Sequence, residues 1–209
     1  MIERRALAHV LNLRSAAIWA AQKQNVQVDQ VNYVVVHMGG GISVAAMREG
    51  RIIDVNDASS AGPFSPERSG TLPLLPVINL CFSGQYTHTQ MKKMIMGEGG
   101  VKAYLGTADI AQVEKMIQNG NASAKLVFDA MVYQIAKEIG AMATVLSGKI
   151  SAIVLTGGLA HSNSIISEVK KRISFIAPVI VLPGELEMEA MALGAQRVLM
   201  GEEFANDYR

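Results

Sequence analysis

Apolar and polar positions along the chain predict one amphipathic helix followed by three short strands. Residues 4–24 have apolar side chains at helical spacing, and those expected on the buried face are Leu7, Val10, Leu11, Ile18 and Ala21. The runs that follow are rich in β-branched residues and predict strands at residues 31–37, 42–48 and 51–56. Glu49-Gly50 suits a tight turn between the last two of these strands.

Residues 57–72 have no periodic pattern and are dense in polar and turn-forming residues. Loops of this length inside a compact domain are uncommon and are usually functional. Arg68 is the only fixed cation in this segment. It is either a solvated surface residue, alone or paired with Glu67, or a phosphate-binding residue, because Ser69 and Gly70 leave room beside it. The pattern leaves both interpretations open.

Residues 73–119 predict an irregular helical insert. Its helical segments are expected at residues 74–82, 89–96 and 110–117. Asp109 is the expected N-cap of the last of these segments. Residues 97–100 are expected to interrupt the helical pattern. The methionines of the insert are interpreted as core filler, and Cys81 as a buried small hydrophobe.

The rest of the chain predicts a long helix and then alternating strands and helices. Residues 123–147 predict the longest helix, with a broad apolar stripe along one side. It is expected to end at Gly148, which suits a left-handed cap. The strand, glycine turn, helix, strand and helix that follow are expected at residues 152–155, 156–158, 163–173, 178–182 and 185–200. Asn163 is the expected N-cap of the first of these two helices. Such a parallel βαβ arrangement binds ligands at the carboxyl ends of its strands.

Composition narrows the class of protein. The chain has 209 residues, of which 50% are hydrophobic and 18% charged, enough for one domain with a full core. Its formal net charge is +1 without long charged runs, so neither a nucleic-acid nor a membrane partner is expected. No apolar run is long enough to span a membrane and no signal peptide is visible, and the single cysteine cannot form an internal disulfide. A cytoplasmic protein is therefore expected.

Three consecutive glycines, Gly39, Gly40 and Gly41, separate the first two strands. Glycine permits positive φ and removes the Cβ atoms that would keep a ligand from the backbone, so successive N–H groups can point at a phosphate. His37 and Ser43 add side-chain donors at the same place. An ordinary tight hairpin would use the same glycines. Neither the Rossmann nor the P-loop spacing is present, so a phosphate here requires a different architecture.

Two further candidates follow the predicted C-terminal strands. Gly157 and Gly158 come after Thr156 and would allow a ligand close approach, although glycine is common after any strand. Glu185 follows Pro183-Gly184 and is expected in the first turn of the last helix, whose dipole favours a carboxylate there. Helix capping alone would explain the same position.

The element order and three motifs resemble a known family. Three antiparallel strands followed by αβαβα resemble one half of the actin-like ATPase (ribonuclease H-like) fold. That half is an α/β domain of order βββαβαβα with a mixed sheet, here with a helical insert at about residues 73–119. The motifs are similar to those of butyrate kinases in the acetate and butyrate kinase family: HMGGGISV from His37, GPFSPERSGTLP from Gly62 and PGELEMEA from Pro183. The resemblance extends from Ile2 to the C-terminus.

This resemblance implies ATP or ADP as ligand. It implies that the outer phosphates lie at the glycine hairpin with His37, and that the adenosine lies at Gly157 and Gly158. Asp109 falls near the expected adenine pocket. Residues 111–112, an alanine and a glutamine, stand where the family suggests charged residues.

The resemblance also implies catalytic residues and Mg²⁺. Arg68 matches the arginine that stabilises the transferring phosphoryl group, and His9 falls where the family has an active-site histidine. Ala8 replaces a bulkier aromatic residue expected before that histidine. Glu185 is the best match to the carboxylate associated with magnesium, and Glu187 is the alternative.

The first half of the family's fold has no match in this chain. That half carries a phosphate loop of Asn-Pro-Gly-Ser type, a substrate-binding arginine and a metal-binding aspartate, whereas the glycine hairpin of this chain resembles the family's second phosphate loop. The resemblance therefore implies that residues 1–209 are the C-terminal, nucleotide-binding half of an enzyme that converts butanoate and ATP to butanoyl phosphate and ADP. We expect it to be inactive without the N-terminal half, which is an expected partner together with a short-chain carboxylate or acyl phosphate and a second copy in a homodimer. The alternative is a non-catalytic module that binds nucleotide or only self-associates.

Overall fold

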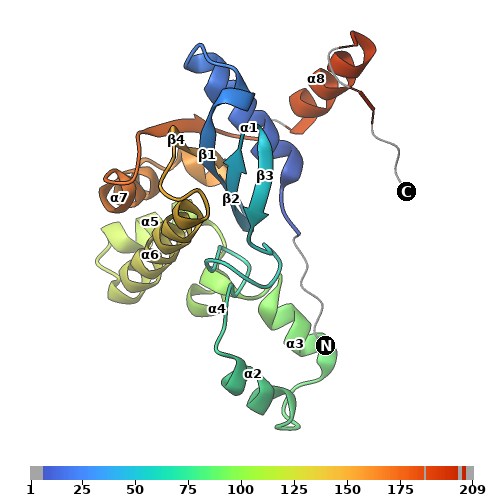
Figure 1. Ribbon diagram of the computed structural model, residues 1–209. Coiled ribbons are helices and arrows are strands. Elements are labelled where there is room, and N and C mark those ends of the chain that lie inside the picture. Colours follow the sequence, from blue (N-terminus) through green and yellow to red (C-terminus); the bar gives the residue numbers. More distant parts are fainter. Residues whose placement is uncertain (1–6, 186, 202–203, 206–209) are drawn as a thin grey trace.

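A mixed sheet of five strands in the order β3-β2-β1-β4-β5 lies at the centre of the molecule (Figure 1). The computed structural model describes residues 7–185, 187–201 and 204–205. The strands are β1 Asn32–Met38, β2 Ile42–Arg48, β3 Arg51–Val55, β4 Ala152–Gly157 and β5 Val179–Pro183. β2 is antiparallel to both β1 and β3, whereas β4 pairs in parallel with both β1 and β5. The predicted strands and their mixed sheet are confirmed.

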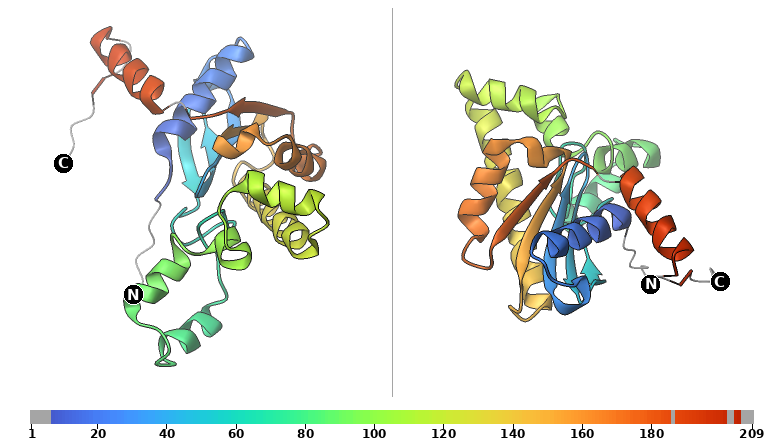
Figure 2. Two further views of the ribbon diagram at one scale, coloured as in Figure 1. Left: turned by 180° about the vertical axis from the view of Figure 1, so that it is seen from behind. Right: turned by 90° about the horizontal axis from the view of Figure 1, so that it is seen from above.

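Helices cover both faces of this sheet (Figure 2). The helices are α1 Val10–Lys23, α2 Leu74–Cys81, α3 His88–Ile95, α4 Gly100–Leu105, α5 Ile110–Gln118, α6 Ala122–Val145, α7 Asn163–Ile173 and α8 Glu187–Leu199. Side chains alternate along β1, so that Val34 and Val36 join the core beneath α6, whereas Tyr33 and Val35 join the core beneath α1. Because both faces are covered, the central strands are apolar at almost every position.

The predicted first helix was wrong in its start and in its buried face. Residues 4–6 lie outside the described part of the chain, residues 7–9 are not helical, and α1 begins at Val10. Its buried face consists mainly of Leu13 and alanines, which confirms the expected Ala21, whereas the expected Leu7 and Leu11 are 59% and 50% exposed. Small side chains let the helix backbone approach the sheet closely, which a pattern weighted by hydrophobicity does not favour.

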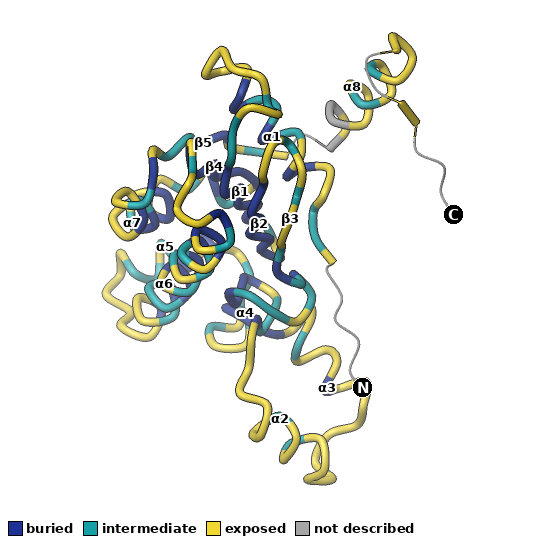
Figure 3. The backbone as a smooth tube through the Cα atoms, viewed as in Figure 1, coloured by how far each residue is buried: buried dark blue, intermediate teal, exposed yellow. Residues whose placement is uncertain are grey.

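The insert divides into a projecting part and a packed part (Figures 1 and 3). α2 buries none of its residues, and Cys81 is exposed, so the expectation of a buried cysteine was wrong. α4 begins within the expected interruption of the helical pattern, because its Val101 is fully buried and donates its backbone N–H to Ser65. Tertiary packing therefore outweighs the low helix propensity of Gly100.

Two predicted cap positions in the C-terminal part need correction. The hydroxyl of Ser162 accepts the N–H of Ile165 and caps α7, whereas Asn163 is the first helical residue. Glu185 precedes α8 rather than lying in its first turn, because that helix begins at Glu187. The long helix α6 and its apolar stripe are confirmed. Within the described residues, no helix is long and apolar enough to cross a membrane.

Candidate active site

The glycine hairpin joins β1 to β2, and two of its glycines lie against side chains of the loop that follows β3. None of Gly39, Gly40 and Gly41 has a positive φ, so the positive φ that glycine permits is not used here. Instead, a Cβ atom on Gly41 would lie 2.2 Å from Nη1 of Arg68, so the guanidinium could not keep its present position. A Cβ atom on Gly40 would lie 3.1 Å from Oε2 of Glu67. The missing Cβ atoms thus let the loop of residues 57–72 close over the hairpin.

Arg68 is held at this hairpin by its own loop. Its Nη1 donates to the carbonyl oxygen of Ala58 at 2.6 Å, and its backbone pairs with Met96 at the end of α3. Among the described residues Arg68 forms no ion pair with Glu67. The guanidinium lies against the glycine turn, and phosphate binding by Arg68 stays a prediction. A guanidinium can donate two parallel hydrogen bonds to the oxygens of one phosphate group.

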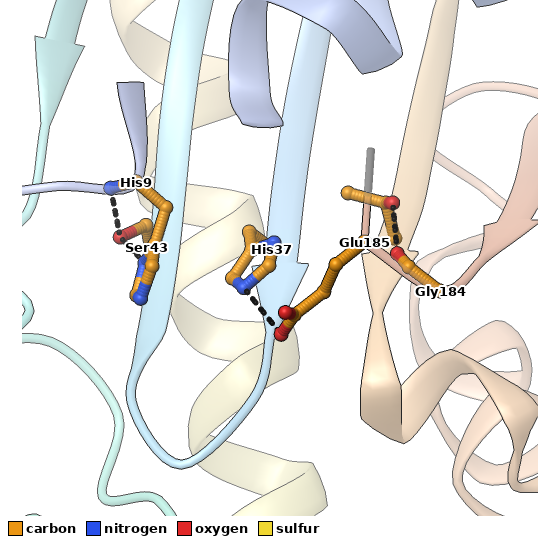
Figure 4. Close-up of polar contacts among 6 residues, drawn as sticks. His9, His37, Ser43, Gly184 and Glu185 are labelled. Carbon is orange, nitrogen blue, oxygen red and sulfur yellow. Dashed lines mark hydrogen bonds and ion pairs between the residues drawn. The ribbon is translucent and has the colours of Figure 1, made fainter. Parts of the chain in front are cut away.

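Two histidines from different elements stack beside the hairpin (Figure 4). The rings of His9, the residue before α1, and His37, in β1, have centroids 4.2 Å apart. Nδ1 of His9 lies 2.8 Å from the hydroxyl oxygen of Ser43, which also accepts the backbone N–H of His9 at 3.3 Å. The bond explains how Ser43, although fully buried in β2, holds His9 at the site.

His37 is an uncharged ring at neutral pH. Its side chain is buried, and burial lowers its pKa to about 4, with a smaller contribution from the charge of His9. Its Nδ1 has no hydrogen-bond partner among the described residues, and its Nε2 lies 3.8 Å from Oε1 of Glu185. That distance is too long for a hydrogen bond, and the Glu185 side chain is 56% exposed. Glu185 can therefore move toward a ligand without breaking a buried bond.

The two glycines after β4 have different roles. Gly157 has a φ of +92°, and a Cβ atom there would lie 2.4 Å from the carbonyl oxygen of Met38 in β1. Its backbone also exchanges two hydrogen bonds with Gly184. Gly158 has open space around its Cβ position and no positive φ, so only Gly158 offers free access to a ligand. The carboxyl ends of β1, β4 and β5 meet at these glycines, the edge at which parallel sheets bind ligands.

Asp109 lies at the start of α5, where it caps the helix by accepting the N–H of Ala111 at 2.9 Å. The contacts that the structure gives for Asp109 are local, so it is not brought into contact with the hairpin. The same helix reaches α7, because Oε1 of Glu114 accepts the hydroxyl of Ser162 at 2.5 Å. A hollow of about 440 Å³ between α5, α6 and α7 is lined by Glu114, Ile117, Phe128 and Asn163, among others.

The described residues contain no preformed metal cage. Within them, no group of three or more His, Cys, Asp or Glu side chains is close enough to hold an ion. Mg²⁺ is commonly bound by one or two carboxylates together with substrate phosphates and water. Glu185 and Glu67 both reach the glycine hairpin and fit that kind of site. The side chain of the alternative, Glu187, lies outside those that the structure describes.

Sequence reasoning did not single out three residues that shape this site. Glu67 was considered only as a partner of Arg68, yet its carboxylate lies over Gly40. The buried Asn56 accepts the N–H of Val44 and donates to the carbonyl of Ile42, which ties the start of the loop to β2. Ser65 is buried beneath Arg68. The only sequence signal was the position of all three in or next to the polar loop.

Comparisons with known proteins agree with the resemblance in the motifs. Probable butyrate kinase 2 of Caldanaerobacter subterraneus subsp. tengcongensis is 50% identical over 207 residues, which are 99% of this chain and 58% of that protein. The chain thus spans less than two thirds of the length of this relative.

Solved structures show the fold. An acetate kinase from Porphyromonas gingivalis superposes with a TM-score of 0.84 at 23% identity, over 91% of this chain and 55% of that one. A propionate kinase from Francisella tularensis subsp. tularensis superposes with a TM-score of 0.78 at 20% identity, over 88% of this chain and 53% of that one. The fold is therefore the actin-like ATPase fold that the element order predicted. The family model described as the Acetokinase family matches residues 8–181, and the chain belongs to that family.

Proposed function

We propose that this chain is the nucleotide-binding part of a carboxylate kinase that interconverts butanoate and ATP with butanoyl phosphate and ADP. Family membership and the 50% identical relative support this reaction class. The observation that carries the proposal is the position of Arg68, whose guanidinium lies directly against Gly41 at the turn between β1 and β2. A fixed cation over a glycine turn at this sheet edge suits an anionic group that approaches the backbone.

The nucleotide would extend along the carboxyl edge of the sheet. Its outer phosphates would lie at the turn formed by Gly39, Gly40 and Gly41, and its ribose at the open backbone of Gly158. The base would then lie between the starts of α5 and α7, near Asp109 and beside the hollow between these helices.

Phosphoryl transfer to a carboxylate requires mainly positive charge and hydrogen-bond donors around the transferring oxygens. Arg68 would stabilise the charge that develops on those oxygens. His9 is oriented by Ser43 and would donate from its other ring nitrogen. His37 would remain a neutral wall of the site, because its pKa lies near 4. When bound with the nucleotide, Mg²⁺ supplies further charge neutralisation, and Glu185 is the residue proposed to hold it.

We further propose that residues 1–209 form the C-terminal domain of a two-domain enzyme. The chain corresponds to 58% of a relative's length, and the described residues supply one wall of a site. The substrate acid, the N-terminal half and a second copy of the chain would be its partners. A second candidate, a module that only binds nucleotide or self-associates, is favoured by the exposed apolar helix α2. Its Leu74 is 76% exposed, and Phe82 just after it is 86% exposed.

Calorimetry with MgADP on the purified chain tests the nucleotide site. We expect Gly40→Val to weaken MgADP binding, because the added side chain would occupy the space next to the backbone N–H groups and Glu67. The matched control is Gly140→Val in α6, where a Cβ atom meets nothing within 4 Å. Equal MgADP affinity in both folded variants and the unmodified chain would contradict the assignment of the hairpin to phosphate binding.

A further inference from the structure

Ser65 makes one side-chain contact to each of the two parts of the proposed site. Its hydroxyl donates to the carbonyl oxygen of Gly40 in the hairpin at 2.6 Å. The hydroxyl oxygen of Ser65 also accepts the backbone N–H of Arg68 at 3.1 Å. The residue is 0% exposed, so water cannot replace either bond. A buried hydroxyl thus connects the glycine turn to the backbone of Arg68, alongside a bond from the N–H of Glu67 to the same carbonyl oxygen of Gly40 at 3.3 Å.

The backbone of Ser65 is itself fixed from two sides. Its N–H donates to the carbonyl oxygen of Arg68 at 3.0 Å, which closes a tight turn over residues 65–68. Its carbonyl oxygen accepts the N–H of Val101 in α4 at 3.0 Å. A Cβ atom on Gly100 would lie only 1.9 Å from that oxygen, so α4 packs directly on the turn. The hydroxyl of Ser65 therefore has little freedom to find other partners.

We infer that Ser65 is a positioning residue that sets the distance between the phosphate-binding turn and the guanidinium of Arg68. The inference rests on the proposed function of these two parts. Besides Ser65, the bond from Nη1 to Ala58 holds the guanidinium, and the pairing with Met96 holds the backbone of Arg68. Loss of the Ser65 hydroxyl would leave the buried N–H of Arg68 without its acceptor. It would also remove one hydrogen bond to the carbonyl oxygen of Gly40. Displacement of a reacting group by about 1 Å can lower turnover by about a hundredfold.

The inference is tested by Ser65→Ala, with Ser69→Ala as its matched control in the same loop. The hydroxyl of Ser69 donates only to the neighbouring carbonyl of Gly70, at 3.2 Å. In the chain combined with an N-terminal half from the relative, we expect Ser65→Ala to lower kcat by roughly ten- to a hundredfold. Ser69→Ala should change kcat less than about threefold, as expected for a residue outside the site.

A double-mutant cycle separates positioning of Arg68 from general damage to the fold. If Ser65 acts through Arg68, Ser65→Ala introduced into the Arg68→Ala variant should lower kcat by less than about threefold further. A loss as large as that in the unmodified background would overturn the inference. If Ser65→Ala does not fold, Ser65→Cys, which keeps the shape but only a weak donor, replaces it in the same cycle.

A second measurement does not depend on kinase activity. In the isolated chain, the Nε–H resonance of Arg68 in a ¹H–¹⁵N NMR spectrum should shift or broaden in Ser65→Ala and stay in place in Ser69→Ala. An unchanged Arg68 resonance in folded Ser65→Ala would overturn the inference. If the combined halves show no kinase activity, the proposed function fails, and this spectrum alone decides whether Ser65 positions Arg68.

Discussion

His37 shows at the scale of one residue how strand geometry sets chemistry. It is the last residue but one of β1, and both neighbouring strands, β2 and β4, pair with it. Its side chain is 1% exposed, and burial first, then the charge of His9, lowers its pKa to about 4. A ring that stays neutral at pH 7 cannot neutralise phosphate charge, so in the proposed site this task falls to the guanidinium of Arg68.

Acid should therefore destabilise the protein through His37. The unfolded chain binds a proton near pH 6.5, whereas folded His37 binds one only near pH 4, so stability is lost as the pH falls between these values. We expect the contribution of His37 to the free energy of unfolding to be lower at pH 4.5 than at pH 7.5, by on the order of 2–3 kcal/mol. Urea denaturation at the two pH values measures it in the unmodified chain and in His37→Gln.

The His37→Gln variant should lose less stability on acidification than the unmodified chain does. His88→Gln is the control, because His88 is exposed at the start of α3 and should leave the acid dependence unchanged. All other titrating groups are retained in both comparisons. Equal acid dependence in His37→Gln and the unmodified chain would show that His37 does not cause the effect.

Sequence reasoning found most residues of the site but not the contacts between them. His37 and Ser43 were expected at the hairpin, and the resemblance placed Arg68 and His9 in the active site. The structure brings all four to the hairpin. The exclusion of a Cβ atom at Gly41 by the Arg68 guanidinium could not be predicted, because the two residues meet only when the loop folds back.

Among the elements, those with strong local signals were predicted well. The three N-terminal strands and α6 were found because their apolar pattern and turns agree with the final packing. α4 was missed because its helix depends on hydrogen bonds to Ser65 and Pro66, which the local sequence does not encode. The exposure of α2 was missed because an apolar run alone does not reveal whether anything covers it.

The junction of β4 with β1 gives a prediction at the same scale. Gly157→Ala should destabilise the fold by about 2–4 kcal/mol, because the residue has positive φ and the added atom would meet the backbone oxygen of Met38. Gly158→Ala, the adjacent control, should change stability by less than about 0.5 kcal/mol, because its Cβ position is open. Urea denaturation at pH 7.5 measures both. Equal destabilisation by both substitutions would contradict the idea that close packing against Met38 limits position 157 to glycine.

At the scale of the molecule, the element order predicted the fold because few topologies combine three antiparallel strands with a parallel βαβ unit. The same order places all candidate groups except Asp109 at one edge of the sheet. Those groups form one wall, with Arg68, His9 and an exposed Glu185, and no group of three metal-binding side chains among the described residues. The opposite wall was inferred only from the family resemblance.

We therefore predict that the isolated chain has no useful kinase activity. Kinases of this architecture are expected to close a cleft around the reaction, which excludes water and aligns donor with acceptor. Alignment of this kind can contribute roughly 7–11 kcal/mol to the lowering of the barrier. A chain that offers one wall lacks, among its described residues, an opposite wall to hold the acid in line with the proposed nucleotide site.

A hydroxamate assay for acyl phosphate, with butanoate, ATP and Mg²⁺, measures this on the purified chain with and without an N-terminal half from the relative. Activity that requires both halves would support the half-enzyme proposal. In that mixture, Arg68→Ala should lower turnover by on the order of a hundredfold or more while MgADP affinity changes little, because the guanidinium acts on charge that develops during transfer. Turnover by the chain alone at the rate of the combined halves would contradict the proposal, since one wall would then contain the whole site.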